Sequence, residues 1–243
     1  MTSLAPGACC MEGYEHAGTA TGTTVSYKGI DIYVAEPTTP TDKCIIYITD
    51  IFGFPFGNHK ILSDNFAKFG FLTVIPNLFY DDAVPYPRPD GFDLPAWVKK
   101  HGIDATEPLI NKAFDYVKEK YPAVTKFFAV GYCFGGKYVV RYLDGRLNAG
   151  FIAHPSFVMA DELKAMKGPL SIAAAETDSI FPEEKRHESE VILKEMKATY
   201  QINLYSSVDH GFAVRGDLGD EVGAWTHEAA FYQAVNWFNR FAK

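Results

Sequence analysis

Residues 127–143 combine three patterns that leave the chain few choices of fold. An apolar run, Phe127-Phe128-Ala129-Val130, is typical of a buried strand. It is followed by Gly131-Tyr132-Cys133-Phe134-Gly135-Gly136 and then by a helical pattern over 137–143. The small glycines on either side of Cys133 allow a tight turn whose central residue adopts a positive φ angle. We therefore predict a strand, a sharp turn with Cys133 at its tip, and a helix that starts directly after the turn.

This arrangement is the nucleophile elbow of α/β-hydrolases, with a thiol where that fold commonly carries a hydroxyl. A sulfur atom at the start of a helix is favoured as a thiolate by the free N–H groups and the helix dipole. The N–H of Phe134 is then directed at a developing oxyanion. The alternative interpretation is that Cys133 is a structural core residue, because free cysteines are often simply buried. The pattern favours covalent catalysis by Cys133 and leaves the structural role open.

Composition narrows the class of protein further. The 243 residues are 47% hydrophobic, which is enough for the core of one large α/β domain. The formal net charge is −7 and the sequence contains no cluster of basic residues, so we expect no nucleic-acid partner. No apolar run is long enough to span a bilayer, and the N-terminus lacks the pattern of a signal peptide, so we expect no membrane association.

The four cysteines give no sign of a disulfide framework or a zinc site. Cys9 and Cys10 are adjacent, and a bridge between them would close a strained ring. Cys44 opens an apolar run and is expected in the core. None of them has CxxC spacing. A free thiol at Cys133 suits a reducing compartment, so we expect a cytoplasmic protein.

Strand and helix patterns alternate along most of the chain. The expected strands are Ile30–Val34 (an edge strand), Cys44–Thr49, Phe71–Ile75, Lys126–Tyr132, Ala149–His154, Leu170–Ala175 and Tyr200–Ser206, and the expected helices are His59–Phe69, Thr106–Glu119, Lys137–Leu143, Glu183–Ala198 and Gly223–Phe241. This order predicts a mostly parallel central sheet with helices on both faces, in a single domain over residues 1–243. We expect residues 1–25 to wrap the surface, and the long Pro76–Pro95 segment, which has no period, to be a functional loop.

Polar residues follow two late strands at the edge where open α/β sheets bind ligands. Asp178 comes after the 170–175 strand and His210 after the 200–206 strand. With Cys133 they follow the chain order nucleophile, acid, histidine. The imidazole would take the thiol proton and the carboxylate would orient the ring. Taken singly, Asp178 could cap the helix that begins near residue 182, and His210 could be an ordinary loop residue. Asp209 is a weaker candidate for the acid, because a sequence neighbour rarely reaches the ring.

Two further strand ends carry candidate residues. Asp50 follows the 44–49 strand and could hold or deprotonate Cys133, although aspartate is also a common turn residue. The N–H of Ile51 would be a second oxyanion donor. His154 could line the pocket or form only local hydrogen bonds. The remaining histidines show no metal-site spacing and no GxGxxG follows a strand, so we assign no metal and no cofactor.

Together these residues resemble the dienelactone hydrolase family. The segment 131–136 with Asp178, His210 and Asp50-Ile51-Phe52-Gly53 carries the resemblance, which extends from about residue 29 to residue 241. The segments 6–10 and 153–157 resemble the fungal branch in particular. The resemblance implies a carboxymethylenebutenolidase-like activity, in which a thiolate opens an unsaturated lactone through an acyl-enzyme. It also implies that an acid in the position of Asp50 keeps the resting thiol protonated until substrate binds.

The sequence departs from the family in the groups that would hold a substrate carboxylate. Bacterial members have glutamate at the position of Asp50 and an arginine four residues after the histidine, where this chain has Val214 and then Arg215. Arg88 is the best match for the second arginine. Phe52 and Phe212, with other aromatic residues, would form a pocket wall or simply belong to the core.

We expect a small lactone or activated ester as substrate, and a monomer or homodimer. A thioesterase, a general carboxylesterase, or a non-catalytic binding protein on the same fold are the alternatives.

Overall fold

The chain folds around an eight-stranded β-sheet, and the computed structural model describes residues 1–243. The strands are β1 (Thr23–Tyr27), β2 (Ile30–Ala35), β3 (Lys43–Ile48), β4 (Leu72–Pro76), β5 (Lys126–Tyr132), β6 (Ala149–Ala153), β7 (Leu170–Thr177) and β8 (Tyr200–Asp209). Their order across the sheet is β1-β2-β4-β3-β5-β6-β7-β8. Strands β3 to β8 are parallel, and β1 and β2 run antiparallel to their neighbours. The mostly parallel sheet predicted from the sequence is confirmed.

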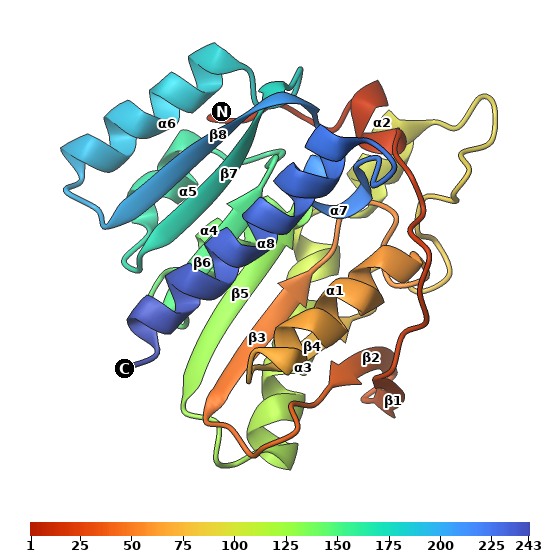
Figure 1. Cartoon of the computed structure of the whole chain (residues 1–243), viewed down its shortest axis with the longest axis vertical. Helices are drawn as coiled ribbons and strands as arrows, with labels where there is room; N and C mark the ends of the chain where they lie inside the picture. The colour runs from red at the N-terminus through yellow and green to blue at the C-terminus, as the bar shows by residue number, and fades with distance from the viewer.

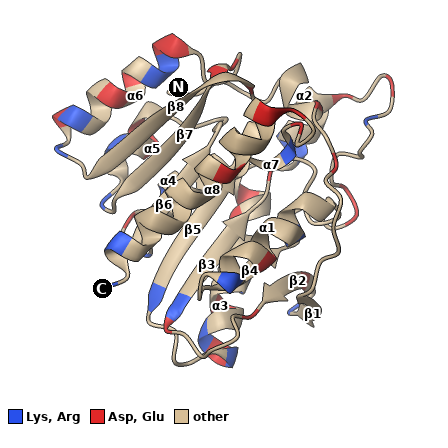
Figure 2. Ribbon diagram, viewed as in Figure 1, with Lys and Arg blue, Asp and Glu red and all other residues tan.

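Helices cover both faces of this sheet. They are α1 (Gly57–Lys68), α2 (Leu94–Lys100), α3 (Ile103–Lys120), α4 (Gly135–Tyr142), α5 (Ala160–Ala165), α6 (Glu183–Glu195), α7 (Phe212–Arg215) and α8 (Glu221–Phe241), with a short 3-10 helix, η1, at Ala8–Met11. Helices α1 and α8 lie on one face, and α3, α4 and α5 lie on the other (Figure 1). Charged residues lie on the outer helices and at strand ends, so the middle of the sheet is apolar on both faces (Figure 2). None of the helices carries an apolar stretch of the length needed to traverse a bilayer.

The expected edge strand at Ile30–Val34 is wrong in its position. It forms β2, which lies inside the sheet, because β1 pairs with its outer side through the register Thr23↔Val34 to Tyr27↔Ile30. Lys28 and Gly29 connect the two strands with φ angles of 46° and 81°. A two-residue turn with both φ angles positive matches the twist of a hairpin. Strand β1 has only five residues, several of them polar, so it contains no apolar run that would predict a strand.

Three short helices were also not predicted. They are α2, α5 and α7, and each has seven residues or fewer. Such helices cover less than two turns, so no repeating apolar face marks them in the sequence. The long segment 76–95 starts at the last residue of β4 and ends in the first turn of α2, and residues 77–93 between them form no helix or strand.

We call the first 22 residues the N-terminal strap. As far as η1 it passes over the carboxyl ends of the strands, and it then runs beside α1 to β1 (Figure 1). Backbone N–H groups of Thr2 and Leu4 donate to Val158 and Ile180 at the β7 side of the sheet. At the other end of the strap, the N–H of Thr21 donates to the Asp64 carboxylate on α1. The strap does more than wrap the surface, since Thr2, Ser3 and Cys10 are buried.

The turn between β5 and α4 has the conformation that the sequence predicts. Cys133 has a φ angle of 48°. A Cβ atom at Gly131 would lie 2.5 Å from the backbone oxygen of Gly135 and 2.7 Å from a methyl carbon of Val139. The backbones therefore approach as closely as they do only because residue 131 has no side chain.

The substitution Gly131→Ala should lower the free energy of unfolding by about 1–3 kcal/mol, the usual effect of overpacking a closely packed site. A matched control is Gly57→Ala at the first residue of α1. There the new Cβ would have no neighbour closer than 3.6 Å, and alanine favours the helix. Urea unfolding of the two variants measures the difference. Equal stability of both variants would show that the turn relaxes freely.

Candidate active site

Asp178 and His210 form a buried pair at the carboxyl edge of the sheet. His210 Nδ1 lies 2.9 Å from both carboxylate oxygens of Asp178. Asp178 follows β7 and does not cap α6; its Oδ1 accepts the N–H groups of Ile180 and Phe181 at 2.8 and 2.9 Å. These bonds fix the carboxylate, which in turn fixes the ring with its Nε2 free to act on another group.

A second thiol contacts both Cys133 and that nitrogen. Cys10, in η1 of the N-terminal strap, has its Sγ 3.4 Å from Cys133 Sγ and 3.4 Å from His210 Nε2. Ser156 Oγ lies 3.7 Å from Cys133 Sγ on another side. The sequence gives no sign of this contact, because Cys10 is 123 positions from Cys133 and 200 positions from His210. The structure places Asp178 against His210 and Cys10 against both His210 and Cys133.

The electrostatics of this row favour a thiolate at Cys133. Burial would raise the pKa of Cys133, but hydrogen bonding with Cys10 and the charge of His210 outweigh it and lower the pKa well below its usual value. The hydrogen bond with Cys133 is the main cause that raises the pKa of Cys10, so Cys10 keeps its proton. Burial opposes the charged form of His210, yet the Cys133 charge and the Asp178 hydrogen bond raise its pKa to about 10. Both shifts favour a Cys133 thiolate beside a His210 imidazolium.

A direct consequence is that His210 should titrate far above an ordinary histidine. We expect its ring protons to shift in NMR spectra near pH 10, and we expect the midpoint to fall in Cys133→Ala, because that variant lacks the negative sulfur. The raised pKa also stabilises the fold: this contribution is complete below about pH 6.5 and is lost as the pH rises through about 10. An identical His210 titration in both proteins would argue against the ion pair.

Two backbone N–H groups near the nucleophile have no acceptor in the protein. They belong to Ile51, directly after β3 and Asp50, and to Phe134, directly after Cys133. Both were expected as oxyanion donors. Buried N–H groups are normally paired, so two unpaired ones beside a thiolate are suited to receive an oxyanion.

The carboxylate of Asp50 contacts other partners than the expected thiol. Its Oδ1 lies 2.8 Å from His59 Nε2 and its Oδ2 lies 2.7 Å from Arg215 Nη1, with all three side chains fully buried. Oδ1 also accepts the N–H of Phe52. Burial opposes ionisation, but His59 and Arg215 lower the pKa of Asp50 to about 2. Asp50 is therefore a charged anchor for Arg215, and the direct contact with Cys133 that the resemblance suggested is not formed.

Arg215 was expected to bind a substrate carboxylate, but its guanidinium group is already occupied. Besides Asp50 it contacts the strap, donating from Nε to the Glu12 carbonyl at 2.6 Å and from Nη2 to the Cys9 carbonyl at 3.5 Å. A Cβ at Gly13 would lie 2.5 Å from the Arg215 side chain, so the strap lies directly against it. Arg88, the other expected arginine, is exposed and does not line the cavity beside His210. The pair of arginines expected for a carboxylate is not assembled.

The remaining expected pocket residues lie around the imidazole and the arginine. The His154 ring centroid is 4.9 Å from that of His210 and 5.8 Å from that of Phe212. Neither ring nitrogen of His154 has a hydrogen-bond partner. Burial, and then the charge of His210, lower the pKa of His154 well below its usual value, so it is neutral. Phe52 is buried with the Arg215 guanidinium 5.5 Å from its ring centroid.

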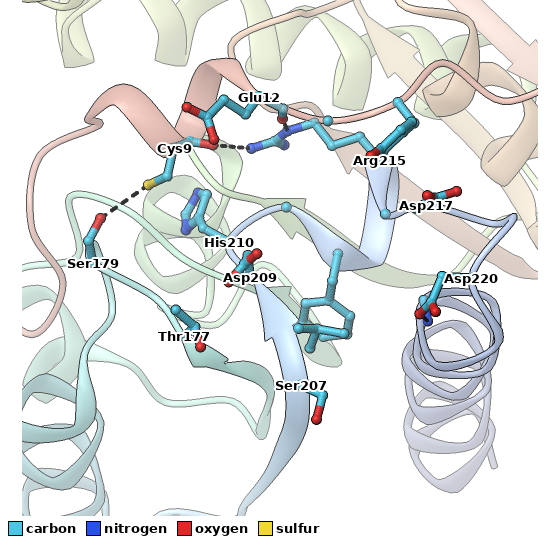
Figure 3. Close-up of a pocket in the computed structure, with 17 residues that line it drawn as sticks. Cys9, Glu12, Thr177, Ser179, Ser207, Asp209, His210, Arg215, Asp217 and Asp220 are labelled. Carbon is cyan, nitrogen blue, oxygen red and sulfur yellow. Dashed lines mark hydrogen bonds between the residues drawn. The ribbon is translucent and has the colours of Figure 1, made fainter.

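A cavity of about 690 Å³ opens beside this site (Figure 3). His210, Cys9, Phe212 and Arg215 are in its wall, whereas Cys133 is not. Four acidic residues also border it: Glu12, Asp209, Asp217 and Asp220. Cys9 Sγ contacts Ser179 Oγ at 3.3 Å across the cavity wall. The cavity therefore borders His210, whose side chain is itself fully buried, and it does not reach the nucleophile.

One group of side chains has the composition of a metal site. The ligand atoms of Cys9, Cys10 and His210 lie within 4.8 Å of one another, and thiolate and imidazole ligands suit zinc. Neither CxxC nor HExxH spacing marks this set in the sequence, because His210 is 200 positions from Cys10. Such a metal would bind Nε2 of His210.

Comparisons with known proteins point to one family. A model of the "Dienelactone hydrolase family" matches residues 30–242. "Hydrolase pyvD" of Aspergillus violaceofuscus is 44% identical, with both chains covered over 100% of their length. "Dienlactone hydrolase 1" of Gibberella moniliformis is 33% identical over 95% of this chain and 92% of its own. Among solved structures, a dienelactone hydrolase-like promiscuous phosphotriesterase, P91, from metagenomic libraries superposes with a TM-score of 0.73 at 17% identity, covering 92% of this chain and 99% of that one.

Proposed function

The chain belongs to the dienelactone hydrolase family and is a hydrolase, and we propose that it cleaves an uncharged lactone or small activated ester through an acyl-enzyme on Cys133. The observation that carries this proposal is the row of Cys133, Cys10, His210 and Asp178, with its lowered thiol pKa and raised imidazole pKa. A thiolate next to an imidazolium is the activated form of a cysteine nucleophile.

In the proposed reaction the Cys133 thiolate attacks the carbonyl carbon. The N–H groups of Ile51 and Phe134 bind the oxyanion that forms. His210 donates its proton to the leaving oxygen, and the bond between that oxygen and the carbonyl carbon breaks. The neutral His210, held by Asp178, then takes a proton from a water molecule that attacks the thioester. Collapse of the second intermediate releases the acid and restores the thiolate and imidazolium.

The strap has to shift during this cycle. Cys10 Sγ lies 3.4 Å from Cys133 Sγ and 3.4 Å from His210 Nε2, so it takes up space beside both atoms. A leaving oxygen needs that same space, since it must receive the proton from Nε2. Cys133 is also completely buried beneath the strap. Substrate entry therefore displaces the segment around η1 while the rest of the site stays in place.

The charges around the site favour an uncharged substrate. The cavity beside His210 has four carboxylates in its wall, and its arginine is already paired with Asp50. An anionic lactone would meet repulsion from the carboxylates and no free cation to balance it. A neutral lactone or ester avoids both costs. Neutral substrates of a carboxylesterase or a thioesterase satisfy the same condition. Activity on different acyl groups and leaving groups therefore has to distinguish these enzymes from a lactone hydrolase.

The experiment that tests the proposal traps the acyl-enzyme. Reduced protein is mixed with p-nitrophenyl acetate, quenched in acid and digested, and we expect the peptide containing Cys133 to gain the mass of one acetyl group. A panel of neutral lactones, the matching carboxylate-bearing lactones, neutral esters and thioesters is assayed in parallel. The proposal requires that kcat/KM be higher for neutral lactones than for the matching carboxylate-bearing lactones, or that a neutral ester or thioester be hydrolysed faster than the carboxylate-bearing lactones. An unlabelled Cys133 in a protein whose thiols all react with iodoacetamide would favour the non-catalytic binding protein.

A further inference from the structure

The contact between Cys10 and Cys133 joins two parts of the chain that are far apart in sequence. Cys10 is held by the strap, whose Cys9 and Glu12 carbonyls are bound by Arg215. Cys133 is held at the tip of the turn between β5 and α4. Their sulfur atoms are 3.4 Å apart, and both residues are completely buried. The hydrolytic mechanism gives Cys10 no step, and requires it to move away.

The position of Cys133 suits disulfide chemistry. It lies at the tip of the turn just before α4, where the free N–H groups of the first helical turn favour a thiolate, with the Cys10 thiol in contact. A disulfide has an S–S length of about 2.0 Å, so a sulfur pair at 3.4 Å has to approach by about 1.4 Å to bond. A thiolate with a second cysteine in contact is the usual arrangement of a reversible redox site.

We propose that Cys10 and Cys133 form a reversible disulfide when the protein meets a hydroperoxide, and that this bond switches the hydrolase off. The first step is attack of the Cys133 thiolate on a peroxide oxygen: an S–O bond forms, the O–O bond breaks, and hydroxide leaves and takes up a proton. Cys10 then attacks the resulting sulfenic acid, so that the S–S bond forms and water leaves. The two sulfur atoms lose two electrons in total, and hydrogen peroxide is reduced to two molecules of water.

This bond would act in two ways. It removes the nucleophile, and it ties the strap to the turn so that the strap no longer opens for substrate. It also protects Cys133, because a sulfenic acid without a partner thiol is oxidised further to forms that thiols do not reduce. A dithiol reductant reverses the bond by exchange and is itself oxidised to a cyclic disulfide. The predicted loss of activity depends on the proposed function of Cys133 as the nucleophile. The predicted formation of the disulfide does not depend on that function.

The test uses full-length reduced protein treated with hydrogen peroxide in slight excess. Peptide mapping without reductant should show the peptides of Cys10 and Cys133 joined, two hydrogens lighter than their sum. Activity on the best neutral ester should fall at least tenfold and return with dithiothreitol. Mapping and activity are measured on the same sample. A joined peptide with unchanged activity would reject the proposed role of Cys133 and keep the disulfide, and lost activity with no joined peptide would reject the disulfide.

Two variants separate this bond from other thiol oxidation. In Cys10→Ala, several equivalents of hydrogen peroxide should still inactivate, but dithiothreitol should restore less than a tenth of the activity, because a second equivalent oxidises the Cys133 sulfenic acid to a sulfinic acid. Cys9→Ser removes the competing thiol in the cavity wall and should still give the joined peptide. Full recovery of Cys10→Ala by dithiothreitol, or loss of the joined peptide in Cys9→Ser, would overturn the proposal.

Discussion

Replacing Cys133 with serine is expected to leave a folded protein that has lost at least about a thousandfold in kcat/KM on an activated ester, since removal of a nucleophile from a coupled site is among the largest effects seen in hydrolases. The thiol pKa is lowered well below its usual value by its surroundings. A serine hydroxyl starts from a far higher pKa, so the same surroundings leave it protonated. Steady-state kinetics on p-nitrophenyl acetate and a thermal melt of both proteins make the measurement.

The matched control is Cys44→Ala, which removes a buried thiol at the start of β3. β3 begins at the opposite edge of the sheet from the site, because its carboxyl end leads into Asp50 and Ile51. This variant should lose stability through the cavity it leaves and keep its kcat. If Cys133→Ser kept activity within tenfold of the unmodified protein, the thiolate mechanism would be wrong.

The parts of the site that the sequence predicts are those set by local pattern and sheet topology. Cys133 is marked by the glycines of a turn that needs them, and Asp178 and His210 follow strands that end at one edge. Parallel strands bring their carboxyl ends together, so residues 45 or 32 positions apart in sequence converge without any further information. The fold is predictable for the same reason, apart from the hairpin strand β1 and the shortest helices.

The contributions of the strap could not be predicted in this way. Cys10 contacts Cys133 over 123 positions and His210 over 200, and no strand or periodic helix leads from one to the other. The partners of Arg215 could not be predicted for a related reason: they include the carbonyl groups of Cys9 and Glu12, and the sequence does not indicate which backbone groups accept hydrogen bonds. Asp50 lies at the predicted strand end. Its pairing with Arg215 could not be predicted, because Arg215 is also held by the carbonyl groups of the strap.

Arg215 is therefore the residue whose loss should most affect stability. In Arg215→Met the buried carboxylate of Asp50 keeps only His59 and one backbone N–H as partners. Breaking a buried ion pair on one side costs about 3–5 kcal/mol, because a charge is left without compensation. For a domain of this size that corresponds to a fall of about 6–20 °C in Tm. Hydrogen exchange should also rise in residues 1–22, since two strap carbonyl groups lose their donor.

Two further variants separate the charge from the strap. Asp50→Asn combined with Arg215→Met removes the uncompensated charge and should recover part of the Tm, while exchange in the strap stays fast. Tyr86→Phe removes a different side-chain donor to the strap, the hydroxyl bound to the Gly13 carbonyl at 2.8 Å. It removes no buried charge and should cost no more than about 1.5 kcal/mol.

The pH dependence of Arg215→Met gives an independent check. The pKa of Asp50 is lowered from 3.8 to about 2 in the folded protein, with the desolvation of the carboxylate outweighed by His59 and Arg215. A lowered carboxyl pKa contributes stability that is present above pH 3.8 and is lost as the pH falls through about 2. The stability gap between the unmodified protein and Arg215→Met should therefore narrow as the pH falls from 4 towards 2. A gap that stays constant over this range would mean that Arg215 acts through packing and the strap alone, without its charge on Asp50.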